Sequence, residues 1–489
     1  MKKTKTFKLL PSLIAVSISI IIWFVIPIPD NLEINAWKLF SIFVGIIFAI
    51  ITKALPIGAL GMISIAIIAC TGITNTNKTI AISDALSGFS NQLIWLIGTS
   101  IMIAVSLNKT GLGKRIGYYF IALFGKKTVG IAYSLVLAET ILAPVTPSNT
   151  ARGGGIIHPI MKSIADSFNS KPSLNTSDKI GRYLSLVNFN INPITSAMFI
   201  TATAPNPLIV NIIMENTNPN FEITWSMWAT AAIIPGIFSL IVMPIVVYWM
   251  YPPIIKITPD APKFAEKQLK KIGKIKKEEI ITLCVFIILL IMWADIPSIF
   301  FGKNFSINPT TAALIGLSIL FTTGVLEWDD ILNTKGAWDT IVWFSALIMM
   351  SSFLSKLGFI HWFSEIIKNM IHNMDISWFL SIFILLIIYV YSHYLFASTT
   401  SHIMAMFAAF FTVGITLGAP PILLALMLSF SSSLMMSLTH YSTGTAPIIF
   451  GSGYATLSEW WKTGFILSVV NLLIWILLGG IWWKILGYW

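Results

Sequence analysis

The stretch that decides the fold runs from Ala143 to Ile157 and reads APVTPSNTARGGGII. It combines two prolines, three glycines and several hydroxyl side chains, and strongly apolar segments lie before and after it. These residues interrupt helices, and hydrocarbon tolerates interrupted backbone only where protein or a water-lined cavity covers it. The stretch therefore predicts the polar tip of a helical hairpin inside a membrane protein.

A second stretch of the same kind, FASTTSH, runs from Phe396 to His402 between two further apolar segments. Interrupted apolar segments in corresponding halves of one chain are typical of the binding site of a secondary transporter. The two stretches together predict one site built from both halves.

The composition places the whole chain in a bilayer. Of its 489 residues, 56% are hydrophobic and 10% are charged, and the mean hydropathy is +0.83. Soluble domains carry about 25% charged residues, so a soluble catalytic domain is excluded. The sequence also lacks a zinc-protease motif, a nucleophile elbow and a Walker loop, so no enzyme is expected. Cys70 and Cys284 lie in apolar runs and are expected to be buried hydrophobic residues.

The apolar segments predict an all-α polytopic membrane protein with about eleven transmembrane helices and two re-entrant hairpins. With a cytoplasmic N-terminus and an outer C-terminus, lysines and arginines are about four times as frequent on the cytoplasmic side as outside, as the positive-inside rule requires. The net charge of +11 thus indicates topology and not nucleic-acid binding. The predicted crossings are 9–27, 36–52, 55–73, 91–108, 184–214, 223–251, 280–298, 307–325, 338–356, 421–451 and 461–487, and the hairpins are 128–168 and 376–418.

The two halves repeat the same order of features: a tryptophan, a hairpin tip and a Thr-Ala-Pro break. The matching residues are Trp95, Ser148 and Thr203 in the first half, and Trp343, Ser398 and Thr445 in the second. Five crossings separate corresponding elements, so the repeats are predicted to be inverted, with the site where they meet. The predicted domains are an N-terminal span at 1–34, a first repeat at 35–251, a cytoplasmic basic linker at 252–279 and a second repeat at 280–489.

Four non-helical breaks share one chemistry: they are rich in hydroxyl groups and contain no carboxylate. They are Ser148–Thr150, Thr201–Pro207, Ser398–Thr400 and Ser442–Pro447. Each should present the N-terminus of a half-helix, whose free N–H groups and positive dipole end favour anions. Carbonyls freed at the opposing ends suit a small cation such as sodium. Neutral donors repeated about a pseudo-twofold axis predict a substrate with a carboxylate at each end.

These motifs resemble the divalent anion:sodium symporter family over nearly the whole chain. The resemblance is carried by the two hairpin tips and by the Thr-Ala-Pro strings at Thr203 and Thr445. The strings HYLFAS, starting at His393, and LTHY, starting at Leu438, are most similar to the branch of plastid 2-oxoglutarate/malate translocators and bacterial citrate/succinate or tartrate/succinate exchangers.

The resemblance implies which residues bind substrate and sodium. In the family, hairpin tips and the residues after the breaks bind substrate carboxylates, which implies Ser148, Asn149, Thr150, Thr203, Ser398, Thr399, Thr400 and Thr445 here. Sodium in the family lies between each tip and a facing break. This implies a first sodium site at Ser148, Asn149 and Ala202, and a second at Ser398, Thr399 and Gly444. Thr399 stands where the first tip has Asn149, which leaves sodium symport and exchange both open.

Charged and titratable residues near the breaks have two interpretations each. Arg152 follows the first tip, and it either binds a dianion through its planar fork or pairs with backbone carbonyls or Glu139. Glu139 either binds a proton or has a structural role. His158, His393, His402 and His440 are expected as packed, hydrogen-bonded side chains, with His402 and His440 the two worth testing.

The sequence thus predicts a secondary active transporter of C4-dicarboxylates or related di- and tricarboxylates in the cytoplasmic membrane. The resemblance implies an elevator mechanism and a homodimer. Sodium symport ranks slightly ahead of sodium-independent carboxylate exchange, and transport of sulfate or an anion channel are further alternatives. Sodium is the one expected cofactor, no organic cofactor is expected, and the partners are the carboxylate substrate and the lipid bilayer.

Overall fold

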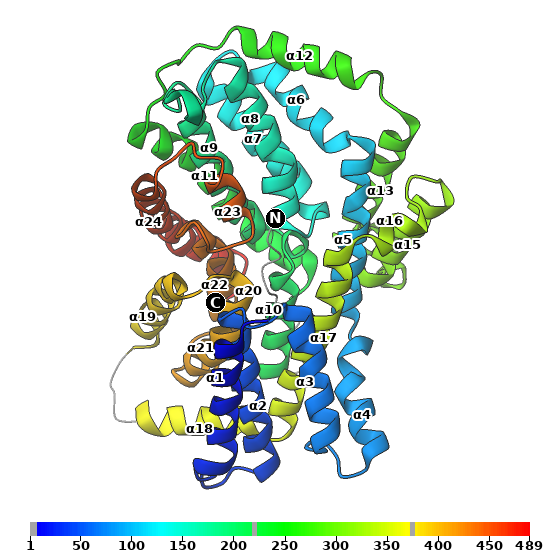
Figure 1. Ribbon diagram of the computed structural model, residues 1–489, viewed down its shortest axis with the longest axis vertical. Coiled ribbons are helices and arrows are strands. Elements are labelled where there is room, and N and C mark those ends of the chain that lie inside the picture. Colours follow the sequence, from blue (N-terminus) through cyan, green and yellow to red (C-terminus); the bar gives the residue numbers. More distant parts are fainter. Residues whose placement is uncertain (1–6, 218–222, 372–376) are drawn as a thin grey trace.

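The computed structural model describes residues 7–217, 223–371 and 377–489 (Figure 1). These ranges consist of α-helices joined by short 3-10 and π-helical turns, and they contain no β-strand beyond one isolated bridge between Lys127 and Ile257. Eight helical segments within them are long and apolar enough to cross a membrane, and four shorter ones are also apolar. The prediction of an all-helical, multi-pass membrane protein is confirmed, whereas the count of eleven crossings stays a prediction.

Of the helices before the first hairpin, those at 34–51, 57–71 and 92–110 form from long apolar runs that end at turn residues. Gly72 and Gly111 have φ angles of 63° and 84° and end two of these helices, a backbone conformation that glycine adopts without strain. In chain order the helices are α1 (Leu9–Ile20), α2 (Ile34–Ile51), α3 (Ile57–Thr71), α4 (Lys78–Leu86), α5 (Gln92–Thr110) and α6 (Leu112–Phe124).

The first hairpin and the interrupted span after it occur where the sequence predicts helix breaks. The chain leaves α7 at Pro144, forms the tip, and returns through a π-helical segment into α8. Between α9 and α10, Phe199 and Thr203 are extended, which interrupts the predicted span 184–214. The elements are α7 (Thr128–Leu142), η3 (Ala143–Val145), η4 (Thr150–Ile157), α8 (His158–Ser167), α9 (Gly181–Met198), η6 (Ile200–Ala202), α10 (Pro205–Asn216) and α11 (Trp225–Met250).

The predicted basic linker contains a helix, α12 (Asp260–Ile272), that packs along α6 at one end of the molecule (Figure 1). Beside it, Arg115 donates to both carboxylate oxygens of Glu279, with 2.9 Å between Nη2 and Oε1. These hydrogen bonds hold the pKa of Glu279 below its ordinary value, so the ion pair fastens α6 to the start of α13.

The second half also contains a hairpin, whose two arms, α19 and α21, pack against each other. Its elements are α13 (Lys277–Trp293), α14 (Ile296–Phe301), α15 (Pro309–Thr322), α16 (Trp328–Leu332), α17 (Lys335–Lys356), α18 (Phe359–Ile371), α19 (Trp378–Tyr391), η8 (Ser392–Leu395), α20 (Thr399–His402), η9 (Ile403–Phe407), α21 (Ala408–Thr416), α22 (Pro421–Leu434), η10 (Met435–Ser437), α23 (Thr445–Phe450), α24 (Leu457–Leu473), η11 (Ile474–Gly479) and α25 (Gly480–Ile485).

Contacts between the halves are reciprocal. Helix α3 packs on α17, and the elements at the corresponding places in the other half, α15 and α5, pack on each other. The π-helical segment after the first tip, η4, contacts α23, and the segment after the second tip, η9, contacts α10. Inverted repeats require such reciprocity, although the repeat bounds 35–251 and 280–489 stay predictions.

Small residues allow these helices to cross closely. A Cβ at Gly61 of α3 would lie 2.9 Å from the Cα of Trp343 in α17, and a Cβ at Gly88 would overlap the backbone carbonyl of Ser345. Close backbone approach through glycine is how helices associate in membranes, where apolar burial gives little driving force.

Gly88→Ala is therefore expected to lower the melting temperature of the purified protein in a thermal unfolding assay. The added methyl group meets backbone that cannot rotate away, and overpacking of this kind costs about 1–3 kcal/mol. Gly480→Ala is the matched control, because a Cβ there would meet no atom within 4 Å. Equal melting temperatures for the two variants would contradict the close crossing.

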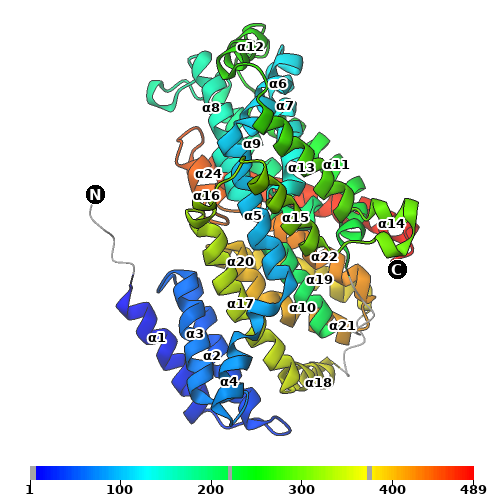
Figure 2. The ribbon, with the colours of Figure 1, turned by 90° about the vertical axis from the view of Figure 1, so that its right-hand side faces the viewer.

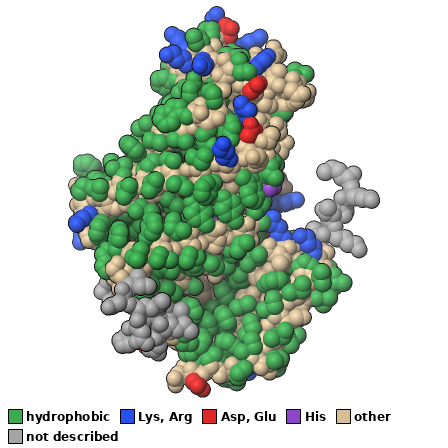
Figure 3. Space-filling view, turned by 90° about the vertical axis from the view of Figure 1, so that its left-hand side faces the viewer, with side chains coloured by type: hydrophobic (Ala, Val, Ile, Leu, Met, Phe, Trp, Pro, Cys, Tyr) green, Lys and Arg blue, Asp and Glu red, His purple; other side chains and the backbone are tan. Residues whose placement is uncertain are grey.

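The molecule is elongated, with two groups of helices displaced along its long axis. Helices α1 to α4 and α18 lie at one end, and α6, α7, α8 and α12 lie at the other (Figures 1 and 2). Charged side chains gather at the α12 end of the molecule, and hydrophobic side chains cover a broad surface below it (Figure 3). The expectation that Cys70 and Cys284 are buried is wrong: both are exposed on apolar helices, where small thiols fit a lipid-facing surface.

A polar contact joins α10 to α17. Ser351 and Ser352 each donate a hydrogen bond to Glu215, with 2.8 Å between the Ser351 hydroxyl and Oε2. One turn earlier on α10, Asn211 accepts a hydrogen bond of 3.1 Å from the amide of Asn91 at the start of α5. Residues four apart lie on one face of a helix, so one polar face of α10 meets both α5 and α17.

Candidate functional site

The four predicted breaks meet around one cavity of about 310 Å³. Both hairpin tips and both interrupted spans contribute to its wall, together with α5 and α17 from the remaining helices. The lining residues are Ile101, Pro147, Ser148, Asn149, Thr150, Thr203, Ala204, Pro205, Gly336, Asp339, Thr340, Trp343, Ser398, Thr399, Thr400, Met436, Thr443 and Gly444.

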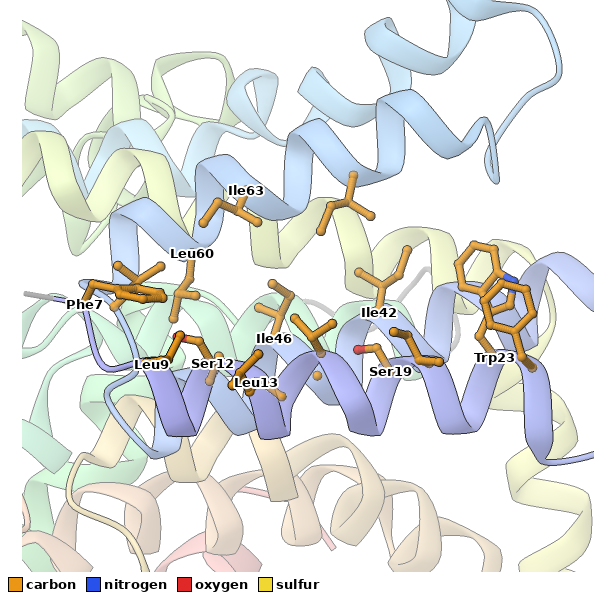
Figure 4. A pocket seen from close by; sticks show the side chains of 18 residues that line it. Phe7, Leu9, Ser12, Leu13, Ser19, Trp23, Ile42, Ile46, Leu60 and Ile63 are labelled. Carbon is orange, nitrogen blue, oxygen red and sulfur yellow. The ribbon is translucent and has the colours of Figure 1, made fainter.

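A second cavity, of about 470 Å³, lies between α1, α2 and α3 and has a different chemistry. Side chains from all three helices point into it, and nearly all of them are aliphatic or aromatic (Figure 4). It offers two serine hydroxyls, Ser12 and Ser19, and no charged group. A charged substrate would lose its hydration there without compensation, so the cavity at the breaks is the candidate site.

The first tip is held by its own backbone and by the second half of the chain. Ser148 caps the returning segment, accepting a hydrogen bond of 3.2 Å from the backbone N–H of Ala151. The Asn149 amide, 8% exposed, donates to the Thr443 hydroxyl at 2.8 Å. Asn149 thus connects the first tip to the second Thr-Ala-Pro break.

The second tip has the same design. Ser398 is extended and caps the following helix by accepting from the backbone N–H of Ser401 at 3.5 Å. The Thr399 hydroxyl donates to the Ser442 carbonyl at 3.1 Å. Asn149 and Thr399 therefore bind adjacent residues of one break, and the structure brings the two predicted tips together.

The two break threonines differ in their surroundings. Thr203 lines the cavity, whereas Thr445 is fully buried and donates to the amide oxygen of Asn192 at 3.3 Å. Gly444 approaches the first tip so closely that a Cβ on it would overlap the Thr150 hydroxyl. Of the eight tip and break residues implied for substrate, all but Thr445 reach the cavity.

Arg152 does not reach the cavity wall. Its side chain and that of Glu139 are both 0% exposed, and they form an ion pair of 2.7 Å between Nε and Oε1. The remaining guanidinium nitrogens donate to backbone and hydroxyl groups, including the Thr146 carbonyl at 2.7 Å and the Ala202 carbonyl at 2.8 Å. This arrangement favours the structural interpretation of Arg152 and Glu139 over substrate or proton binding.

The two implied sodium sets are placed differently. Ser398, Thr399 and Gly444 all line the cavity, and neutral oxygen donors of this kind suit a hard cation. In the first set Ser148 and Asn149 line the cavity, but Ala202 lies outside its wall and its carbonyl accepts from the Arg152 guanidinium. The Arg152 guanidinium therefore already uses one of the two lone pairs of this oxygen.

Two histidines pack behind the second tip. His393 and His402 are buried with 3.0 Å between their Nδ1 atoms, and His393 Nε2 lies 3.2 Å from the Ser442 carbonyl that also accepts from Thr399. His440 accepts from the Trp461 indole at 3.1 Å, and His158 lies 3.3 Å from the Asn188 amide. All four are hydrogen-bonded, as the sequence predicts.

Sequence reasoning missed the wall contributed by α5 and α17. Gly336, Asp339, Thr340 and Trp343 are spaced by three and four residues, so one face of α17 forms this wall. The sequence does contain a signal for this wall. Trp343 marks the predicted repeat, and Asp339 and Gly336 lie one and two helical turns before it. Asp339 is the one charged side chain among the residues that line the cavity.

The fold and the site define a class of protein: a membrane transporter, in which hairpins from two halves of an apolar chain enclose a polar cavity. Comparison with known proteins gives the family. Residues 6–489 match the family described as the sodium:sulfate symporter transmembrane region, and the chain belongs to this family of divalent anion:sodium symporters. It is a membrane transporter and not an enzyme, as predicted.

Individual relatives agree with the predicted branch. The chain is 48% identical over 487 residues to a putative malate transporter, YflS, of Bacillus subtilis, covering 100% of this chain and 98% of the relative. It is 42% identical over 479 residues to the chloroplastic dicarboxylate transporter 1 of Arabidopsis thaliana, covering 98% and 83%. Among solved structures, the Alcanivorax borkumensis YdaH transporter superposes with a TM-score of 0.57 at 9% identity, covering 88% of this chain and 97% of that one, which shows likeness of fold.

Proposed function

We propose that this protein carries C4-dicarboxylates, or related di- and tricarboxylates, across the cytoplasmic membrane through the cavity at the breaks. The observation that carries the proposal is the meeting of both hairpin tips around one cavity lined by hydroxyls and an amide. Helix N-termini at the two tips add backbone N–H groups and a positive dipole end. The relatives named for malate and dicarboxylate transport support the same substrate class.

Purified protein is expected to melt at higher temperature with succinate, malate or 2-oxoglutarate than without. A ligand that binds only the folded state stabilises it by about 2.7 kcal/mol at 100 times its dissociation constant. Citrate, tartrate and sulfate, each with and without sodium, complete the series. Stabilisation by sulfate alone would favour the inorganic-dianion alternative and would contradict carboxylate transport.

The placement of Arg152 favours exchange over the sodium symport that ranks first from sequence. The guanidinium donates to the Ala202 carbonyl, an implied ligand of the first sodium site, so this oxygen keeps one lone pair for a sodium ion, which would lie beside a fixed positive charge. Ser398, Thr399 and Gly444 remain as the set that would hold one. Sodium there would offset part of the substrate's charge.

Exchange predicts uptake into proteoliposomes that is indifferent to replacing sodium by choline and that requires dicarboxylate inside the vesicle. Symport predicts uptake that falls when choline replaces sodium and that needs no dicarboxylate inside the vesicle. Vesicles loaded with succinate or with buffer, each assayed in sodium, lithium and choline, separate the two. Conductance without saturation would instead support an anion channel.

We infer further that the hairpins and interrupted spans move as one unit against the other helices, in an elevator mechanism within a homodimer. The cavity supports such a division, because its wall is made by the tips and breaks on one side and by α5 and α17 on the other. With the N-terminus and the basic linker in the cytoplasm, the α12 end is the cytoplasmic end. A cross-link between α10 and α17 that left transport intact would contradict the movement.

A further inference from the structure

One face of α17 brings a carboxylate to a cavity proposed to bind carboxylates. Asp339 lines the cavity with Gly336, Thr340 and Trp343, and the other residues of the lining are hydroxyl-bearing, amide, apolar or glycine residues. No lysine, arginine or histidine is among them. The wall therefore holds a negative charge that no cationic side chain in the same lining offsets.

The Asp339 carboxylate is fixed in place by α3. It lies against Gly58, in the first turn of that helix. The first N–H groups of a helix have no partner within it, and this end of a helix favours a carboxylate. A Cβ on Gly58 would overlap the carboxylate oxygen, so only glycine permits this approach.

Asp339 also lies where two cavities adjoin. A wider cavity of about 670 Å³ shares Gly336 and Asp339 with the candidate site and is lined in addition by Lys335. Lys335 thus places a positive charge in the wider cavity, next to the part of the wall that holds Asp339.

We propose that Asp339 is a specificity-determining residue that limits the charge of the transported carboxylate and favours dianions over trianions. This inference rests on the proposed carboxylate transport and narrows its substrate class. Coulomb repulsion is proportional to the charge of the ligand, so a trianion is repelled half as much again as a dianion at the same distance. The neutral hydroxyls that bind a carboxylate at each end add nothing that compensates a third charge.

Asp339→Asn removes the charge and keeps the shape of the side chain, including an acceptor oxygen that can lie against Gly58. The measurement is kcat/KM for succinate and for citrate at neutral pH, in proteoliposomes loaded with the same substrate. The ratio of citrate to succinate is expected to rise by roughly tenfold, which corresponds to about 1.4 kcal/mol. Asp329→Asn removes the same charge from an exposed position outside both cavities and should leave the ratio unchanged.

Each outcome decides between the alternatives. An unchanged ratio in Asp339→Asn overturns the charge limit, and so does an equal loss of both activities, which would mark Asp339 as a cation ligand or as a structural cap. If Asp339→Asn melts well below the wild type, Asp339→Ser, which also offers an acceptor oxygen, is measured in its place. Wild-type protein that carries neither carboxylate would instead refute the proposed function itself.

Discussion

Asn149→Ala is expected to reduce carboxylate uptake by roughly 100-fold or more, to the background of empty vesicles. The amide joins the first tip to Thr443 at 2.8 Å and lies in the cavity wall, so the variant loses both the contact between the halves and a donor to the substrate. A hydrogen bond to a charged substrate contributes about 1.5–3 kcal/mol and a neutral one, such as that to Thr443, about 0.5–1.5 kcal/mol, and together they account for the loss.

The control is Asn190→Ala. This amide is buried in α9 and donates to the Leu186 carbonyl of its own helix at 2.8 Å, away from the tips. Both variants should insert and fold to similar levels, so that uptake alone separates them. Uptake by Asn149→Ala within a fewfold of wild type would refute the assignment of the site.

Arg152→Ala is expected to destabilise the protein by about 3–5 kcal/mol, because it leaves the Glu139 carboxylate charged, fully buried and without its partner. The same change frees the carbonyls of Thr146 and Ala202. Thermal unfolding of the detergent-purified protein measures the loss, together with the yield of folded protein.

The paired variant gives the control. Arg152→Met combined with Glu139→Gln removes both charges at once, and replacing a buried ion pair by neutral groups is often tolerated. The double variant should recover a large part of the melting temperature lost by Arg152→Met alone. If the single and double variants melt alike, the ion pair is not what joins the two arms of the hairpin.

Much of the site could be predicted because helix-breaking residues have no other place in an apolar chain. The first tip was predicted from Pro144, Pro147 and the hydroxyl-bearing residues beside them, and the second from Ser398 to Thr400. That the two tips meet was predicted because a tryptophan, a hairpin tip and a Thr-Ala-Pro break follow in the same order in both halves. The partners of each side chain could not be predicted, since they come from residues far away in sequence, such as Asn149 and Thr443.

The helices α6, α12 and α18 were missed for a different reason. Each has 13 residues, too few to cross a bilayer, and each carries charges that exclude it from an apolar-segment search. Their apolar residues follow a helical period that only an amphipathic reading detects. The wall formed by α17 was missed because Asp339 and Thr340 interrupt no helix, so a search for helix breaks passes over them.

The implied sodium ligands include one whose partners the family resemblance could not predict. Ala202 has the expected place in the chain, yet its carbonyl accepts from a guanidinium that is 13 residues from its own carboxylate partner. A backbone ligand has no sequence signature, because any residue type supplies the same oxygen. Only the position of Arg152 in space reveals that this oxygen is already bound.

The contact between Glu215 and the hydroxyls of Ser351 and Ser352 has a kinetic consequence. If α10 moves with the hairpins, the substrate-free protein must break the hydrogen bonds of Glu215 before it can change from one orientation to the other. These bonds therefore raise the fraction of substrate-free molecules in the arrangement seen here. Apparent affinity scales with the fraction of molecules that are competent to bind. The half-saturating substrate concentration should therefore be lower on the side of the membrane to which this arrangement opens than on the opposite side. Replacing Glu215 by glutamine should reduce the difference between the two concentrations.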